Sequence, residues 1–158
     1  VLIGGMGMGF TLAAALNSLG EDAEVTVAEL VPEVVEWNKG PLGSASGYPL
    51  NDSRSIIHLG DVAQLLKQQE GIYDAILLDV DNGPEGLTRK ENDWIYSAEG
   101  IAQAKSALKA NGILAYWSAG ADPVFTAKLK AAGFRVKAET VRAHKPGKGA
   151  KHVIWLAW

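Results

Sequence analysis

The sequence predicts an α/β fold built on a mostly parallel β-sheet, and three observations lead to this prediction. Short apolar runs typical of strands alternate with segments whose apolar residues recur at helical spacing. A glycine-rich turn joins the first strand to the first helix. The last two strand-like runs have no helix between them, so one of them is expected to be antiparallel, whereas strands separated by helices run parallel with right-handed crossovers.

Apolar patterning and end signals define the elements of the first quarter of the chain. "VLIGG" (1–5) is a compact apolar strand, and 10–19 carries apolar residues at helical spacing up to a glycine. "AEVTVAEL" (23–30) predicts the second strand. The helix expected at 32–40 has a proline in its first turn and a glycine at its end.

The middle of the chain continues the alternation after a long connection. Residues 40–53 are rich in glycine and proline, and we expect a loop there that is either a mobile lid over the ligand or a disordered excursion. "RSIIHLG" (54–60) predicts the third strand, and a helix follows at about 61–69. "YDAILLD" (73–79) is the most apolar strand, as expected of a central parallel strand that is buried on both faces.

The last third predicts two helices and three strands. A helix is expected at 94–108, followed by the turn "KANG" and the strand 113–119. The helix predicted at 122–133 begins with an aspartate suited to the N-cap. "FRVKAETV" (134–141) and "HVIWLAW" (152–158) are the two closing strands.

Composition limits the class of protein. The 158 residues are enough for one domain (1–158), and 47% hydrophobic with 21% charged residues is typical of soluble globular proteins. A net charge of −3 does not favour nucleic acid. We expect no membrane span and no signal peptide, hence a cytoplasmic protein. Because Val1 already lies in a strand-like run, we expect an N-terminal segment to precede it.

The glycine-rich turn is the first candidate site. Gly5, Gly7 and Gly9 alternate where the first strand passes into a helix, so backbone N–H groups and the helix N-terminus can face a ligand. Such turns also occur for packing alone. A dinucleotide fingerprint needs a small residue where this chain has Phe10. The pattern therefore favours a nucleoside ligand without a pyrophosphate.

Carboxylates follow the next three strands. Glu29 ends the second strand, 20 residues after Gly9, where it can accept both hydroxyls of a ribose; alternatively it is an exposed strand-end residue. Asp61 follows the third strand and can meet an adenine amino group, a role compatible with capping the next helix. Asp79 and Asp81 follow the fourth strand.

Four stretches, "IGGMGMG", "VAELVPEVVEWNKG", "GDVAQLL" and "YDAILLDVDNGPEGL", together resemble the class I S-adenosylmethionine-dependent transferases. More narrowly, they resemble the spermidine/spermine synthase-like family. The resemblance implies a Rossmann-like methyltransferase fold: seven strands in the order 3-2-1-4-5-7-6, the last antiparallel, with helices on both faces. It also implies S-adenosylmethionine or its decarboxylated form across the carboxyl ends of strands one to four. The scattered histidines predict no metal site.

The resemblance implies a catalytic role at the end of the fourth strand. In spermidine synthases the aspartate matching Asp79 takes a proton from the attacking amine, which has no free lone pair near neutral pH because its pKa is about 10. We predict Asp79 and Asp81 as catalytic residues, with Asn82, Trp94 and Tyr96 on the acceptor side, since aromatic faces attract cations. Alternatively, Asp79 caps the following segment and the two aromatic residues serve only packing.

Departures from the family pattern leave three functions open. The family's second strand-four aspartate is Asn82 here, and the aspartate that grips the amine of the decarboxylated donor is Gly7. The family's N-terminal β-hairpin domain does not occur in this sequence. The first function is methyl transfer to a small acceptor such as an amine. The second is aminopropyl transfer to make a polyamine. The third is nucleoside binding without chemistry. A homodimer is one option for the oligomeric state.

Overall fold

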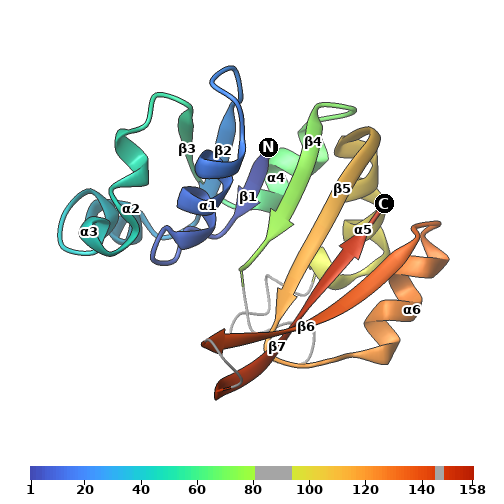
Figure 1. Ribbon diagram of the computed structural model, residues 1–158. Helices are drawn as coiled ribbons and strands as arrows, with labels where there is room; N and C mark the ends of the chain where they lie inside the picture. Colours follow the sequence, from blue (N-terminus) through green and yellow to red (C-terminus); the bar gives the residue numbers. More distant parts are fainter. Residues whose placement is uncertain (81–93, 145–147) are drawn as a thin grey trace.

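A seven-stranded mixed sheet forms the centre of the computed structural model, which describes residues 1–80, 94–144 and 148–158 (Figure 1). The strands are β1 (Leu2–Gly4), β2 (Val25–Glu29), β3 (Ser55–Leu59), β4 (Tyr73–Leu78), β5 (Leu108–Ser118), β6 (Val136–His144) and β7 (Lys148–Ala157). Their order in the sheet is β3-β2-β1-β4-β5-β7-β6. Only β7 runs antiparallel to its neighbours in this sheet of described strands. The predicted fold class and strand order are confirmed.

Helices pack on both faces of the sheet (Figure 1). They are α1 (Phe10–Ser18), α2 (Pro32–Lys39), α3 (Gly43–Ser46), α4 (Val62–Gln68), α5 (Ala98–Ala107) and α6 (Pro123–Ala131), with a short 3-10 helix, η1 (Pro49–Asn51). Neighbouring residues of β1 point to opposite faces: Ile3 belongs to the core cluster that includes residues of α1 and α2, whereas Leu2 belongs to the cluster that includes residues of α4, α5 and α6. This alternation explains why the apolar runs of the sequence are continuous.

The register of the central strands brings their carboxyl ends to one edge. Gly4 in β1 lies opposite Ala28 in β2 and Leu78 in β4, and all three strands are parallel. The residues that follow these strands are therefore neighbours in space although they are far apart in the chain. This edge is where the glycine turn and the strand-end carboxylates meet.

Two predictions about the segment 94–112 are wrong in detail. The helix begins at Ala98 because the hydroxyl of Ser97 caps it, accepting a hydrogen bond from the backbone N–H of Gly100 at 3.1 Å. Residues 94–96 form a separate 3-10 turn. The expected turn at 109–112 is an irregularity within β5, since Tyr73 and Ala75 of β4 lie opposite Leu108 and Ile113.

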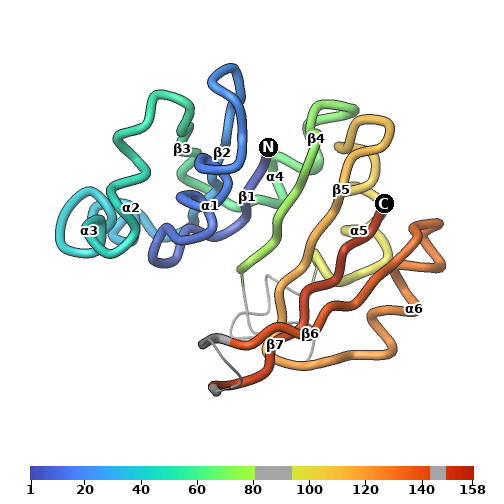
Figure 2. Tube along the Cα trace, in the orientation of Figure 1, coloured from blue at the N-terminus to red at the C-terminus, as the bar shows by residue number. Residues whose placement is uncertain are grey.

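The glycine- and proline-rich connection is not a disordered excursion, because it forms short helices. It holds α3 and η1, and the backbone N–H of Tyr48 donates to the Gly43 carbonyl at 2.7 Å. The closing hairpin is also longer than expected, because β6 and β7 stay paired up to His144 and Lys148 (Figure 2). No helix in the described ranges combines the length and the apolar content needed to cross a bilayer.

Candidate active site

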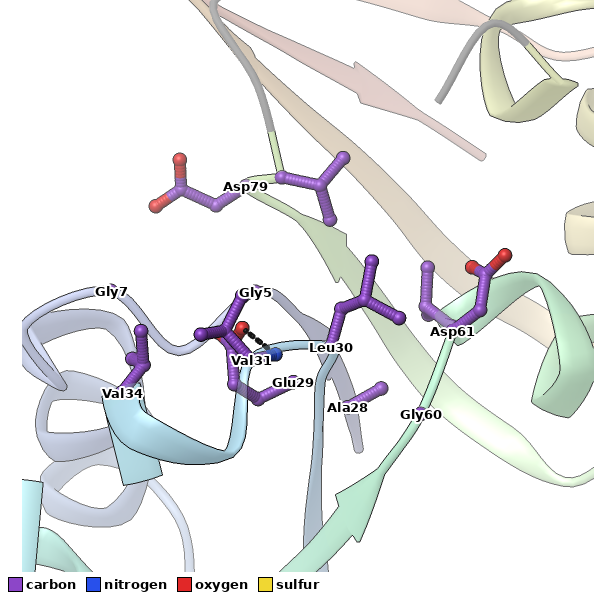
Figure 3. A pocket seen from close by; sticks show the side chains of 12 residues that line it. Gly5, Gly7, Ala28, Glu29, Leu30, Val31, Val34, Gly60, Asp61 and Asp79 are labelled. Atoms are coloured by element: carbon purple, nitrogen blue, oxygen red, sulfur yellow. Dashed lines mark hydrogen bonds between the residues drawn. The ribbon is translucent and has the colours of Figure 1, made fainter. Parts of the chain in front are cut away.

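A cleft of about 260 Å³ lies at the carboxyl ends of β1 to β4 (Figure 3). Its walls come from the turn after β1, the end of β2 and the start of α2, the β3–α4 turn and the end of β4. Five residues predicted from the sequence line it: Gly5, Gly7, Glu29, Asp61 and Asp79. The volume is slightly below that of typical ligand pockets, roughly 300–1,000 Å³.

Gly5 lets the end of β1 lie against the end of β4. It has a φ of +87°, and a Cβ atom there would lie 2.3 Å from the carbonyl oxygen of Asp79. Two hydrogen bonds of 2.9 Å secure the turn, from the Gly5 N–H to the Ala28 carbonyl and from the Asp79 N–H to the Gly4 carbonyl. A side chain at this position would therefore push the turn away from Asp79.

Gly7 and Gly9 serve different purposes. A Cβ atom on Gly7 (φ +50°) would meet no atom within 4 Å, so this glycine leaves open space at the cleft. Gly9 (φ +78°) is buried, and a Cβ atom there would lie 2.8 Å from Asn38 Oδ1 and 2.9 Å from Ser46 Oγ. Gly9 does not line the cleft, so its position in the structure corresponds to close packing of α1 against α2 and α3.

Glu29 is buried, with 8% of its surface exposed, and is not the exposed strand-end residue of the alternative interpretation. Its Oε2 accepts a hydrogen bond from the Met6 N–H at 2.9 Å. Its Oε1 accepts one from the Val31 N–H at 2.8 Å (Figure 3). The carboxylate thus ties the glycine turn to the start of α2. Each carboxylate oxygen keeps a second lone pair for a ligand hydroxyl.

Asp61 caps α4, as the sequence predicts. Its Oδ1 accepts a hydrogen bond from the Ala63 N–H at 2.9 Å, and the side chain lines the cleft beside Gly60. Contact with an adenine amino group stays a prediction for the remaining oxygen.

Asp79 lies just beyond β4, and its side chain is exposed at the cleft. The Thr11 hydroxyl donates to its Oδ2 at 3.3 Å. Partial desolvation by the surrounding protein raises the pKa of the Asp79 carboxyl, and the hydrogen bond from Thr11 opposes that rise. A carboxylate with a raised pKa at the edge of a cleft is suited to accepting a proton.

The predicted acceptor residues do not meet at the cleft in the described parts of the chain. Tyr96 is only 3% exposed and packs its ring against Tyr116 and Phe125, with centroids 5.7 and 5.4 Å apart. Trp94 is half-buried, and the Lys67 ammonium lies 4.3 Å from the centroid of its ring. These positions fit the packing alternative, because the 3-10 turn before α5 directs both rings toward the core. Asp81 and Asn82 lie outside the described residues.

Two residues of the site escaped the sequence analysis. Asn38 is fully buried, and its Nδ2 donates to the carbonyls of Gly7 and Val34, both at 2.9 Å. Its spacing of three from the buried Val35 was a usable signal, because it places Asn38 on the inner face of α2. Thr11 had no such signal, since its partner Asp79 is 68 positions away.

The charged side chains in the described lining of the cleft are all acidic. Glu29, Asp61 and Asp79 line it, and its described lining includes no lysine or arginine. The described residues also hold no group of three or more histidine, cysteine or acidic side chains placed to bind a metal ion. The three carboxylates therefore suit a cation that presents hydroxyl and amino groups to them.

Comparison with solved structures shows the same fold in two enzyme classes. A spermidine synthase from Thermotoga maritima (17% identity, TM-score 0.73) and a spermidine synthase in complex with the transition state analogue AdoDATO (20%, 0.71) each match 99% of this chain. The chain spans about half of both, 51% of each. A precorrin-6y C5,15-methyltransferase from Geobacter metallireducens matches 100% of this chain over 79% of its own length (16%, 0.69).

The family of this chain is identified from its amino-acid sequence. No curated protein matches the chain. A family model described as the spermine/spermidine synthase domain matches residues 1–129, which include the glycine turn, all three cleft carboxylates and the helices that position them. The chain therefore belongs to the spermine/spermidine synthase domain family.

Proposed function

We propose that this domain is an S-adenosylmethionine-dependent methyltransferase that acts on a small amine. The observation that carries the proposal is the set of three carboxylates, at the ends of β2, β3 and β4, around a glycine turn with no cationic side chain in its described lining. S-adenosylmethionine supplies a methyl group on a sulfonium cation. A cationic nucleoside and an ammonium acceptor both suit such a cleft.

The residues present fit the nucleoside part of the donor. The spare lone pairs of Glu29 can accept the two ribose hydroxyls, and the free oxygen of Asp61 can accept an adenine amino hydrogen. Leu30, Val31 and Val62 supply apolar surface to the same cleft, against which an adenine ring can pack.

The start of α1 supports intact S-adenosylmethionine as the donor, because this molecule carries a carboxylate that its decarboxylated form lacks. Gly9 offers no side-chain cap, and the first turn of α1 contains no acidic residue. The first N–H groups of a helix have no partners within it and attract anions. Gly7 places no carboxylate near this turn. A free amine there, as in the decarboxylated donor, would have no anionic partner from residue 7.

The position of Asp79 at the cleft and the raised pKa of its carboxyl support a role as the base that acts on the acceptor. Its carboxylate attracts an ammonium group and removes one proton, which frees the nitrogen lone pair. When bound, S-adenosylmethionine would supply the methyl carbon to which this nitrogen bonds, and the electrons of the carbon–sulfur bond would pass to sulfur. Because the Asp79 side chain is exposed, the proton can pass from its carboxyl to water.

Aminopropyl transfer is the second candidate, favoured by the family and by the two spermidine synthases of similar fold. Calorimetric titration with S-adenosylmethionine, its decarboxylated form and methylthioadenosine separates the candidates. We expect intact S-adenosylmethionine to bind most tightly. Tighter binding of the decarboxylated donor would support aminopropyl transfer instead, and absence of binding by all three would contradict both enzymatic functions.

Gly7→Asp should shift the donor preference toward the decarboxylated form. The space beside Gly7 is open, and aspartate and asparagine tolerate its positive φ best among the other residues. A new carboxylate repels that of S-adenosylmethionine and pairs with a free amine, which we expect to change the affinity ratio by about tenfold or more.

Gly7→Asn is the matched control for this experiment, because it has the same shape without the charge. Calorimetry on both variants measures the ratio of the two dissociation constants. An equal ratio in the Asp and Asn variants would show that residue 7 does not face the donor tail.

A further inference from the structure

Thr11 is the one residue in the described structure that forms a hydrogen bond with the Asp79 side chain. We propose that Thr11 is a positioning residue: its hydroxyl holds one oxygen of the Asp79 carboxylate so that the other faces the acceptor. The inference rests on the proposed function, in which Asp79 takes the proton of an amine. Nothing in the sequence pattern pointed to this threonine.

The backbone around this contact is well anchored. The Asp79 N–H donates to the Gly4 carbonyl at 2.9 Å, and the Asp79 carbonyl lies against Gly5. Thr11 is the second residue of α1 and is half-buried, and its branched side chain has few rotamers. The Thr11 hydroxyl is thus presented from a helix, whereas the Asp79 side chain projects from the end of a strand and has no other hydrogen-bond partner among the described residues.

The two oxygens of the Asp79 carboxylate differ in their hydrogen bonds, and this difference assigns their roles. Oδ2 accepts from Thr11 at 3.3 Å, and Oδ1 has no partner among the described residues. The 3.3 Å separation is long for an O–H···O bond, and such contacts in ligand-free sites often shorten when substrate binds. Oδ1 is therefore the oxygen that can accept the ammonium proton.

The Thr11 hydroxyl has a second effect, which is on the pKa of the Asp79 carboxyl. Glu29 from β2 and Asp61 from the β3–α4 turn line the same cleft with the same sign, and the described lining includes no cation to offset them. The Thr11 hydroxyl is the described group that favours the charged form of Asp79. The hydrogen bond lowers the Asp79 pKa, against the rise caused by desolvation. Without it, more of the carboxyl would be protonated and unable to act as a base.

The test measures the Asp79 titration directly and needs no acceptor. Protein labelled with ¹³C at aspartate Cγ is titrated by NMR, and the Asp79 resonance is identified by its loss in Asp79→Asn. We expect Thr11→Val, which has nearly the same shape, to move the titration midpoint to higher pH. Thr11→Ser should restore it toward the wild-type value, because it keeps the hydroxyl.

Two further measurements make the outcome decisive. Thermal unfolding and S-adenosylmethionine titration should be nearly unchanged in Thr11→Val, which shows that its fold and donor site persist. An unshifted Asp79 titration in that variant would overturn the role of Thr11 and leave the proposed function standing. Failure of the wild-type chain to bind S-adenosylmethionine would contradict the proposed function, while the NMR titration still decides whether Thr11 controls Asp79.

Discussion

Asp79→Asn is expected to lower methyl transfer by about a hundredfold or more, the usual loss when a general base is removed. Asparagine keeps the size of the side chain, and its Oδ1 can still accept a hydrogen bond from Thr11. Donor affinity should therefore stay nearly the same. Turnover with saturating S-adenosylmethionine and a panel of primary monoamines and diamines measures the first effect, and calorimetry measures the second.

The pH dependence of the same reaction provides a check on the assignment. A base works only when deprotonated, and desolvation raises the Asp79 pKa above its ordinary value of 3.8. The rate should fall as the pH is lowered through that raised pKa, so the acidic limb of the profile lies above pH 3.8. Any residual activity of Asp79→Asn should not show this limb. Full activity in that variant would exclude Asp79 as the base.

Glu29→Ala is expected to weaken S-adenosylmethionine binding at least about tenfold. A charge-assisted hydrogen-bond pair to the ribose contributes on the order of 1.5–3 kcal/mol, and 1.4 kcal/mol corresponds to a factor of ten. The same substitution leaves the N–H groups of Met6 and Val31 without their acceptor. Each such loss costs about 1 kcal/mol or more, so the glycine turn should loosen and the unfolding temperature should fall.

Two variants separate these effects. Glu29→Gln keeps the shape but turns one acceptor into a donor that faces a backbone N–H, so we expect an intermediate loss of affinity. Glu33→Ala, an exposed glutamate in the first turn of α2, removes the same charge nearby and should leave donor binding unchanged. Donor affinity equal to wild type in Glu29→Ala would remove Glu29 from the proposed site, whatever its effect on stability.

The strand ends and the carboxylates that follow them could be predicted because they depend on local patterns. Apolar runs mark the strands, and parallel strands bring their carboxyl ends to one edge. Gly5, Glu29 and Asp61 therefore reach the cleft where expected. The start of α5 was misplaced by four residues, 94 instead of 98, because the Ser97 cap competes with an apolar pattern that continues on both sides of it.

Contacts between distant segments decided the rest. Gly9 faces Asn38 and Ser46 rather than the cleft, and the Tyr96 ring enters the core. These outcomes depend on how helices pack across the sheet, which periodicity along one segment does not describe. The bond between Thr11 and Asp79 joins residues 68 positions apart. A sequence pattern places each residue on its own element, but only the packing of α1 against the end of β4 brings a hydroxyl within reach of a carboxylate.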